Sequence, residues 1–340
     1  MSVLGGYQVN DRAAGLLEQY EIEVLRTRKG RSAILCDTDK GCLIFKEYTG
    51  NESRIAMQDK LLTYIGQQHK VHTESIIPTK EGALFVKDMD GVKYILKTFC
   101  EGRECNIYDK GECLEAVSQL AHLHQCMELP VSIEQSVISF SPAKEYEKRN
   151  KELKKVRKFL QQKGQKSAFE MYLNKQFDFF LEQALFVTEE WEGYQKILNT
   201  DKEKTAAITY CHGDYQYHNL LYSDKNWYII NFEKCMADNP IRDLHLFLRK
   251  LLEKSNWSIS LGEELLAAYE RERPISAISY IDLYYRLAYP EKFWKIVNFY
   301  YNSRKAWIPE RNQEKLTRLV LQEKEKQHFL EEVFCSVRRR

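Results

Sequence analysis

The feature that most constrains this chain is the run HGDYQYHN, which extends from His212 to Asn219. In it, an aspartate follows a His-Gly pair, and four residues separate Asp214 from Asn219. Asn231 comes twelve residues later, in the tripeptide NFE at the end of an apolar stretch that reads as a strand. A carboxylate, a carboxamide and a further polar group after a hairpin are the groups that phosphoryl transfer uses. The spacing therefore indicates phosphoryl-transfer chemistry.

Each group has a separate role in that chemistry. Asp214 would orient or deprotonate the acceptor hydroxyl, and Asn219 would offer a carbonyl oxygen to Mg²⁺. The group after the strand normally holds the metal that bridges the phosphates. Lys46, at the end of the apolar segment CLIFK, would reach the nucleotide phosphates. Taken alone, the HGD tripeptide could be a turn and Lys46 an exposed lysine at a strand end, so the interpretation depends on their order along the chain.

The first hundred residues are predicted to be rich in strands. A β-meander with tight turns is expected, followed by one helix and two more strands. The expected strands cover residues 20–26, 32–37, 42–46, 83–86 and 93–99, the helix covers 52–68, and a basic turn covers 27–32.

Helical periodicity dominates from Cys113 onward. Residues 144–182 are expected to form two long amphipathic helices, and helices resume at about Arg242. The expected fold class is α+β, with two domains. Residues 1–100 would form a β-rich lobe on the nucleotide side, and residues 101–340 would form a helical lobe. The helical lobe would carry the catalytic loop 212–219 and the metal-position strand 227–233.

Composition excludes several classes of protein. The chain has 51 Lys and Arg against 49 Asp and Glu, and a net charge of +2 argues against a nucleic-acid coating protein. No stretch of about 18 apolar residues and no secretory signal are visible, so cytoplasmic synthesis and no membrane partner are expected. The nine cysteines form no CxxC pair, which favours free thiols over a disulfide framework or a zinc site.

One segment departs from the charge balance. Residues 144–166 hold ten Lys and Arg against three Glu. The simpler interpretation is the solvated face of an amphipathic helix. The alternative is a docking surface for an acidic partner or a polyanion.

Several blocks together resemble the aminoglycoside phosphotransferase and choline kinase branch of the protein-kinase-like superfamily. Within that branch, the chain resembles the spore coat CotS family. The general resemblance rests on CLIFKEY, EGR at 101–103, LAHLH at 120–124, HGDYQYHNLL, and DNPIRDL at 238–244. The resemblance to the CotS family rests on YPEKFWK at 289–295 and YYNSRKAW at 300–307.

The resemblance implies a role for each matching residue. Lys46 matches the lysine that contacts the phosphates, Asp214 the aspartate of the catalytic loop, and Asn219 one metal ligand. Asp243 matches an aspartate that usually steadies the catalytic loop, and His212 matches a structural histidine of the same loop. ATP and Mg²⁺ are the cofactors that the resemblance implies.

Two positions depart from the family pattern. Asn231 stands where the main metal-binding aspartate is expected, and the loss of a carboxylate there should weaken Mg²⁺ binding. Glu233 would supply the missing carboxylate only if the strand continues that far. The expected glycine-rich loop has a single glycine, since Gly30 is the only glycine between residues 28 and 32. The helix carboxylate expected to pair with Lys46 is Asp59, with Glu52 as the alternative.

Three functions follow from these observations. The first is a kinase-like spore coat protein with an impaired metal site, little phosphotransfer and a role in coat assembly with other coat proteins. The second is an active phosphotransferase that uses Mg²⁺ and ATP, with an alcohol group of a small molecule or a coat component as acceptor. The third is a basic-helix interaction module. Location in the spore coat is implied by the resemblance alone.

Overall fold

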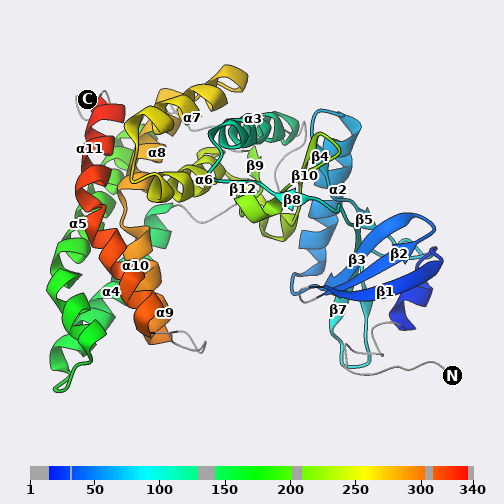
Figure 1. Cartoon of the computed structure of the whole chain (residues 1–340), viewed down its shortest axis with the longest axis horizontal. Coiled ribbons are helices and arrows are strands. Elements are labelled where there is room, and N and C mark those ends of the chain that lie inside the picture. Colours follow the sequence, from blue (N-terminus) through cyan, green and yellow to red (C-terminus); the bar gives the residue numbers. More distant parts are fainter. Residues whose placement is uncertain (1–14, 31–32, 129–141, 201–208, 303–308, 336–340) are drawn as a thin grey trace. The chain divides into compact units, whose positions relative to one another are not determined.

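The computed structural model describes residues 15–30, 33–128, 142–200, 209–302 and 309–335 (Figure 1). The chain divides into two compact units. Unit 1 comprises residues 1–137 and 209–236, and unit 2 comprises residues 138–208 and 237–340. Both units are therefore discontinuous in sequence. The predicted lobe boundary near residue 100 stays a prediction.

Unit 1 contains a mainly antiparallel sheet with the strand order β1-β2-β3-β7-β5, and β6 also pairs with β7. Its strands are β1 (Val24–Gly30), β2 (Ala33–Thr38), β3 (Gly41–Glu47), β5 (Ile76–Ile77), β6 (Val86–Lys87) and β7 (Lys93–Thr98). The predicted basic turn at 27–32 is wrong for residues 27–30, which belong to β1. This strand lies at the sheet edge and is almost fully exposed, so charged side chains do not oppose strand formation there.

The register of β3 against β7 places two lysines on one face. Lys46 is paired with Ile95, and Lys97 is paired with Ile44. Side chains two residues apart on a strand share a face, so Lys46 and Lys97 are diagonal neighbours across the ladder. The opposite face holds the unit's apolar core, which includes Leu17, Tyr20, Ile34, Cys36, Leu43, Phe45, Val86 and Leu96.

The helices of unit 1 start at clear N-caps. Helix α2 (Glu52–Gln67) matches the predicted helix, and the Asn51 side chain accepts a hydrogen bond from the backbone N–H of Arg54. Helix α3 (Lys110–Cys126) begins after Asp109, whose side chain accepts from the N–H of Glu112. The short 3-10 helix η1 (Gly15–Gln19) precedes the first strand.

The second chain segment of unit 1 joins strands from the first. Strands β10 (Leu220–Ser223) and β11 (Asn226–Ile229) form a hairpin. β10 pairs with β8 (Arg103–Glu104), and β11 pairs in parallel with β4 (His72–Thr73). The remaining elements of this segment are β9 (Thr209–Cys211), η3 (Tyr217–Asn219), η4 (Phe232–Lys234) and β12 (Met236–Asp238), which extends across the unit boundary.

Unit 2 is helical, as predicted. Its helices are α4 (Pro142–Gln162), α5 (Ala168–Thr200), α6 (Ile241–Lys254), α7 (Ile259–Glu272), α8 (Ala277–Ala288), α9 (Glu291–Asn302), α10 (Pro309–Leu321) and α11 (Glu323–Val333). Several cations of the basic run form ion pairs, for example Arg149 with Glu145 at 2.5 Å and Lys163 with Glu170 at 2.7 Å. These ion pairs agree with the simpler interpretation, in which the basic run is the solvated face of an amphipathic helix.

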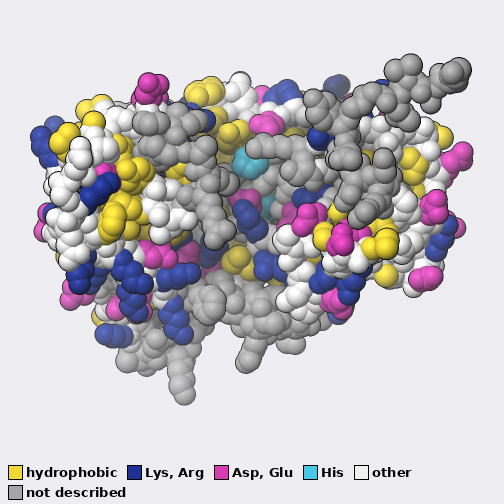
Figure 2. All heavy atoms as spheres, turned by 90° about the horizontal axis from the view of Figure 1, so that it is seen from below, with side chains coloured by type: hydrophobic (Ala, Val, Ile, Leu, Met, Phe, Trp, Pro, Cys, Tyr) yellow, Lys and Arg dark blue, Asp and Glu magenta, His cyan; other side chains and the backbone are white. Residues whose placement is uncertain are grey.

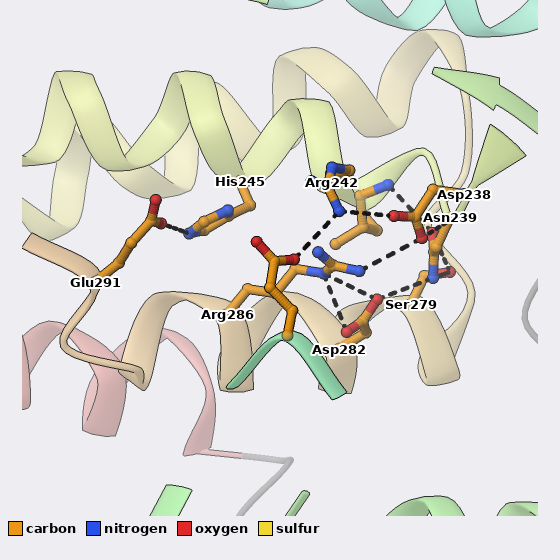
Figure 3. A network of polar contacts seen from close by, with 10 residues as sticks. Asp238, Asn239, Arg242, His245, Ser279, Asp282, Arg286 and Glu291 are labelled. Atoms are coloured by element: carbon orange, nitrogen blue, oxygen red, sulfur yellow. Dashed lines mark hydrogen bonds and ion pairs between the residues drawn. The ribbon is translucent and has the colours of Figure 1, made fainter. Parts of the chain in front are cut away.

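A polar network connects the start of α6 to α8 within unit 2 (Figure 3). Arg286 donates to Asp282 at 3.1 Å, and its Nη2 lies 3.6 Å from Asp238. Arg242 donates to the other oxygen of Asp238 at 3.0 Å. The Asn239 side chain donates to Asp282 at 3.3 Å. The DNPIRD block therefore has a structural role in unit 2.

The surface charges, the helices and the cysteines of the described residues match three expectations from the composition. Figure 2 shows Lys and Arg side chains interspersed with Asp and Glu on the face that it draws. No helix in the described part of the chain is long and apolar enough to cross a membrane. The nine cysteines are free thiols, and Cys335 is exposed.

Candidate functional site

The predicted catalytic loop follows β9 through a turn that only glycine fits. Gly213 has φ +79°, and a Cβ there would lie 2.1 Å from the carbonyl oxygen of Lys234. The His212 ring connects the catalytic loop to the residue before Asn231. Its Nδ1 accepts a hydrogen bond from the N–H of Asp214 at 3.2 Å, and its Nε2 lies 2.9 Å from the carbonyl oxygen of Ile230. The contacts of His212 agree with the structural role expected for it.

Asp214 is held by two side chains. Lys234 Nζ donates to Asp214 Oδ2 at 2.8 Å, and Gln216 Nε2 donates to Oδ1 at 2.7 Å. Burial raises the pKa of Asp214, but the hydrogen bond and the positive charge of Lys234 lower it by more, so the pKa lies below its usual value. The carboxylate is therefore ionised and already has a cation beside it.

The two predicted amide ligands are hydrogen-bonded to each other. Asn219 Nδ2 donates to the carbonyl oxygen of Asp214 at 2.8 Å, which directs Asn219 Oδ1 toward Asn231. Asn231 Nδ2 donates to that oxygen at 2.8 Å. Asn231 has φ 67° and ψ 57°, a left-handed conformation that asparagine tolerates better than most residues. This bond occupies one of the two acceptor positions of Asn219 Oδ1.

The strand before Asn231 is shorter than predicted. β11 ends at Ile229, and residues 232–234 form the 3-10 helix η4 instead of continuing the strand to 233. The condition under which Glu233 would share a face with Asn231 is therefore not met. The left-handed Asn231 redirects the chain and sends Glu233 toward the sheet.

Glu233 forms ion pairs with both lysines on the sheet face. Its Oε1 lies 3.0 Å from Lys46 Nζ and 2.7 Å from Lys97 Nζ. Burial opposes ionisation of this carboxyl group, but Lys97 and Lys46 together lower its pKa to about 2. Lys46 therefore pairs with Glu233 rather than with the expected helix carboxylate. Asp59 lies on α2, where partial burial raises its pKa, and the alternative Glu52 pairs with Lys87 at 3.5 Å.

Glu74 extends this group of charges. It lies between β4 and β5, accepts from Lys97 at 2.8 Å through Oε2, and accepts from the N–H of Phe232 at 3.0 Å through Oε1. The Lys97 side chain is only 3% exposed, and burial would lower its pKa, yet the two carboxylates raise it. We call Lys46, Lys97, Glu74 and Glu233 the charge cluster.

Helix α2 contacts the same segment through Arg54. Its Nε donates to the carbonyl oxygen of Glu233 at 3.1 Å, and its Nη2 donates to the carbonyl oxygen of Cys235 at 3.1 Å. Sequence reasoning missed Arg54, Glu74, Lys97 and Lys234. Only Lys234 had a usable signal, because it directly follows the NFE tripeptide.

A cavity of about 390 Å³ opens beside the charge cluster within unit 1. Its lining comes from the ends of β3 and β7, the 99–101 segment and the β10–β11 hairpin. The lining residues are Cys42, Thr73, Glu74, Thr98, Phe99, Cys100, Glu101, Ser223, Asp224, Tyr228 and Ile230. The volume and the mixture of backbone, apolar and acidic groups suit a small organic ligand.

The remaining two predicted residues are Gly30 and Asp243. Gly30 ends β1, and a Cβ there would lie 3.3 Å from Leu35 Cγ, so close packing within the hairpin accounts for the glycine. Arg31 and Ser32 of the expected glycine-rich loop lie outside the described residues. Asp243 lies in the first turn of α6, in unit 2.

The low pKa of Glu233 makes a specific prediction about acid stability. A carboxyl group whose pKa is lowered on folding stabilises the protein above its unfolded pKa of about 4.3, and that contribution is lost as the pH falls through the folded value. Between about pH 4.3 and 2, the free energy of unfolding of the unmodified chain should fall by up to roughly 3 kcal/mol more than that of Glu233→Gln.

Acid titration of the free energy of unfolding would measure this effect. The exposed Glu81→Gln is the matched control, and its curve should follow that of the unmodified chain. If Glu233→Gln leaves the slope unchanged, the ion pairs of Glu233 do not persist in solution.

Comparisons with known proteins show what the chain is similar to. The family model described as "Spore coat putative kinase YutH" matches residues 13–333. The chain is 24% identical over 330 residues to "Spore coat protein S" of Bacillus subtilis (strain 168), covering 90% of this chain and 88% of that protein.

Solved structures share the fold at low sequence identity. An aminoglycoside phosphotransferase from Alicyclobacillus acidocaldarius superimposes with a TM-score of 0.81 at 17% identity, covering 98% of each chain. Spectinomycin phosphotransferase APH(9)-Ia, in complex with ADP and spectinomycin, gives a TM-score of 0.61 at 17% identity and covers 94% of this chain and 95% of that chain. The expected kinase-like fold is confirmed.

Proposed function

The chain belongs to the spore coat YutH kinase family, and on this premise we propose that it is a kinase-like spore coat protein with an impaired metal site. It would bind ATP without a metal ion, transfer phosphate very slowly or not at all, and act in coat assembly. The hydrogen bond from Asn231 Nδ2 to Asn219 Oδ1 carries this proposal.

The donor set at this point does not fit Mg²⁺. A magnesium site in proteins uses one or two carboxylates together with the phosphates. Here Asn231 presents an N–H group to Asn219, and the nearby carboxylate of Glu233 is shared by two lysines. Asp214 has the Lys234 ammonium beside it. Charges that a metal would balance in an active kinase are balanced by lysines of the chain itself.

The case for nucleotide binding rests on the cavity beside the charge cluster. Glu74 of the cluster lines this cavity, and the Lys46 side chain of the same cluster is a quarter exposed, so a polyphosphate can approach it. One structural neighbour, spectinomycin phosphotransferase, is in complex with ADP. These observations support ATP as the ligand, with its phosphates at Lys46.

The role in the coat rests on the family and on one relative. Spore coat protein S is named for the coat, and the chain is similar to it over most of both lengths. Other coat proteins are the partners that this relationship suggests.

An active phosphotransferase is the second candidate. Asp214, Asn219 and Lys46 are all present, and a neighbouring structure holds spectinomycin, a small hydroxylated molecule. In this case the acceptor would be an alcohol group of a small molecule or of a coat component. This candidate requires metal-dependent nucleotide binding, which the first one does not.

Thermal unfolding with millimolar ATP tests the proposal. In EDTA, ATP should raise the melting temperature by a few degrees, since a ligand at 100 times its Kd stabilises by about 2.7 kcal/mol. Adding Mg²⁺ should change this shift little, and Lys46→Ala should remove it. The exposed Lys60→Ala, on α2 of the same unit, should keep it.

Each other outcome has a definite meaning. A shift that needs Mg²⁺ would favour the active phosphotransferase. No shift in either buffer would refute nucleotide binding and leave only the coat-assembly role.

A further inference from the structure

Unit 2 contains a second cavity, of about 340 Å³, and none of the predicted site residues lines it. The end of α6, the start of α9, and helices α10 and α11 form its walls. Its cationic lining residues include Arg249, Lys250, Lys254, Arg311, Lys315 and Arg318.

The lining carries a large excess of positive charge. Eight of the lining residues are Lys or Arg, and four are Glu. Two of the glutamates are already shared among cations. Glu253 accepts from Arg249 at 2.5 Å and from Lys292 at 3.0 Å. Glu291 lies 2.5 Å from Lys295 and 3.4 Å from Arg249. Glu253 and Glu291 are therefore already paired, and Glu314 and Glu323 are the two other acidic residues of the lining.

Helix α10 presents three of these cations in one row. Arg311, Lys315 and Arg318 stand four and three residues apart, a spacing that places them on one face of a helix. Among the residues that the structure describes, none of the three forms an ion pair or a side-chain hydrogen bond. Like charges in such a row repel one another, and Glu314, three residues after Arg311 and four before Arg318, offsets part of that repulsion.

The pKa values of two lysines agree with this crowding. Burial, followed by the neighbouring Arg311 and Lys292, lowers the pKa of Lys315. Burial and then Lys292 lower the pKa of Lys250 as well. Both shifts are in the direction that surplus positive potential produces.

Aromatic residues form another part of the lining. Trp257 and Tyr289 line the cavity and are almost fully buried. Lys326 Nζ lies 5.8 Å from the centre of the Trp257 ring. Apolar surface beside cations suits a ligand that has a carbon skeleton as well as charge.

We propose that this cavity binds a small anion that carries two or more phosphate groups. A phosphate monoester carries about −1.5 to −2 at pH 7, so two of them match the surplus of four positive charges among the lining residues. Arginine pairs with phosphate through two parallel hydrogen bonds, and the α10 row supplies two arginines. The proposal is independent of nucleotide binding in unit 1.

Isothermal titration calorimetry on the full chain at about 150 mM salt, a physiological ionic strength, tests this proposal. The probes are inorganic tripolyphosphate and fructose 1,6-bisphosphate, with citrate as a carboxylate of comparable charge. The cavity should bind one molecule per chain, and the double variant Arg311→Gln/Lys315→Gln should weaken that binding by at least about tenfold, since each lost charge-assisted hydrogen bond is worth about that much. Because the phosphates of ATP are proposed to lie at Lys46, the tripolyphosphate titrations use Lys46→Ala as the background. Tighter binding of one probe distinguishes an organic from an inorganic phosphate source.

Two further variants separate this site from other binding. Lys155→Gln/Lys158→Gln removes two exposed lysines of α4 outside the cavity, and Lys46→Ala disables the proposed nucleotide site. The α4 variant should bind the probes normally, and Lys46→Ala should keep the binding at this cavity. Equal weakening in the α4 variant would show non-specific attraction, and loss of all probe binding in Lys46→Ala would place the probe in unit 1. Citrate that binds as tightly as the phosphates would show that charge alone decides. Any of these results overturns the proposal.

Where Arg311→Gln/Lys315→Gln proves unstable, Arg318→Gln alone replaces it. Arg318 is exposed on the last turns of α10, and the single change removes one contact only. Unchanged binding in this variant would then refute the site.

Discussion

Replacing Asn231 with Asp should raise Mg²⁺-dependent ATP hydrolysis by about a hundredfold, which corresponds to roughly 2.7 kcal/mol in the barrier. In the structure, Asn231 Nδ2 and Asn219 Oδ1 lie 2.8 Å apart. An aspartate would place an oxygen at that position, and two oxygens at that distance repel each other. Ligands on adjacent corners of octahedral Mg²⁺ stand about 2.9 Å apart, given metal–oxygen bonds of about 2.0–2.1 Å. The substitution therefore converts an internal hydrogen bond into a pair of metal ligands.

Hydrolysis is the appropriate readout because water replaces the unidentified acceptor. Asn226→Asp makes the same chemical change on the exposed start of β11 and should leave the rate unaltered. Adding Asp214→Asn to Asn231→Asp should remove the gain. If Asn231→Asp changes the rate by less than about threefold, the asparagine is not what limits the chemistry, and the active-phosphotransferase candidate gains support.

Replacing Lys97 with Met should destabilise unit 1 by about 3–5 kcal/mol, because it leaves a buried carboxylate without its cation. Glu74 has a side chain only 5% exposed and contacts the Lys97 ammonium at 2.8 Å. Methionine nearly preserves the volume of the lysine stem, so the loss is electrostatic rather than a packing defect. Amide hydrogen exchange in β3 and β7 should become about a hundredfold faster or more.

Two variants define what the Lys97 result means. Lys87→Met removes a surface lysine whose partner Glu52 is also exposed, and it should cost less than about 1 kcal/mol. Lys97→Met/Glu74→Gln should recover part of the lost protection, because glutamine keeps an acceptor for the N–H of Phe232. A double variant no more stable than Lys97→Met would contradict the electrostatic explanation.

Local patterns in the sequence predict most of the fold and the position of the catalytic loop. Helix α2 has the expected bounds within one residue, because its apolar spacing and the Asn51 cap are both local features. Lys46 lies on β3, and the His-Gly-Asp turn depends on Gly213, whose positive φ is itself a local requirement.

The partners in the site could not be predicted, since they depend on long-range register. Glu233 meets Lys46 and Lys97 across 187 and 136 residues of sequence. The left-handed conformation of Asn231 ends the strand early, and a strand prediction from apolar residues cannot detect such a turn. The pairing of Lys46 with the helix carboxylate Asp59 follows only from the family pattern, and the diagonal register of two lysines on one sheet face instead favours a single carboxylate between them.

The discontinuous composition of unit 1 has a consequence for protein synthesis. Its first 137 residues leave the ribosome well before the hairpin of β10 and β11, which supplies the partners of β8 and β4. At about 5–20 residues per second, the nascent chain waits roughly 5–20 s for residue 236. During that interval two strand edges lack their partners, and Lys97 of β7 has Glu74 but not yet Glu233 as a partner. Unpaired edges promote aggregation, so chaperone demand during translation should be concentrated in this window.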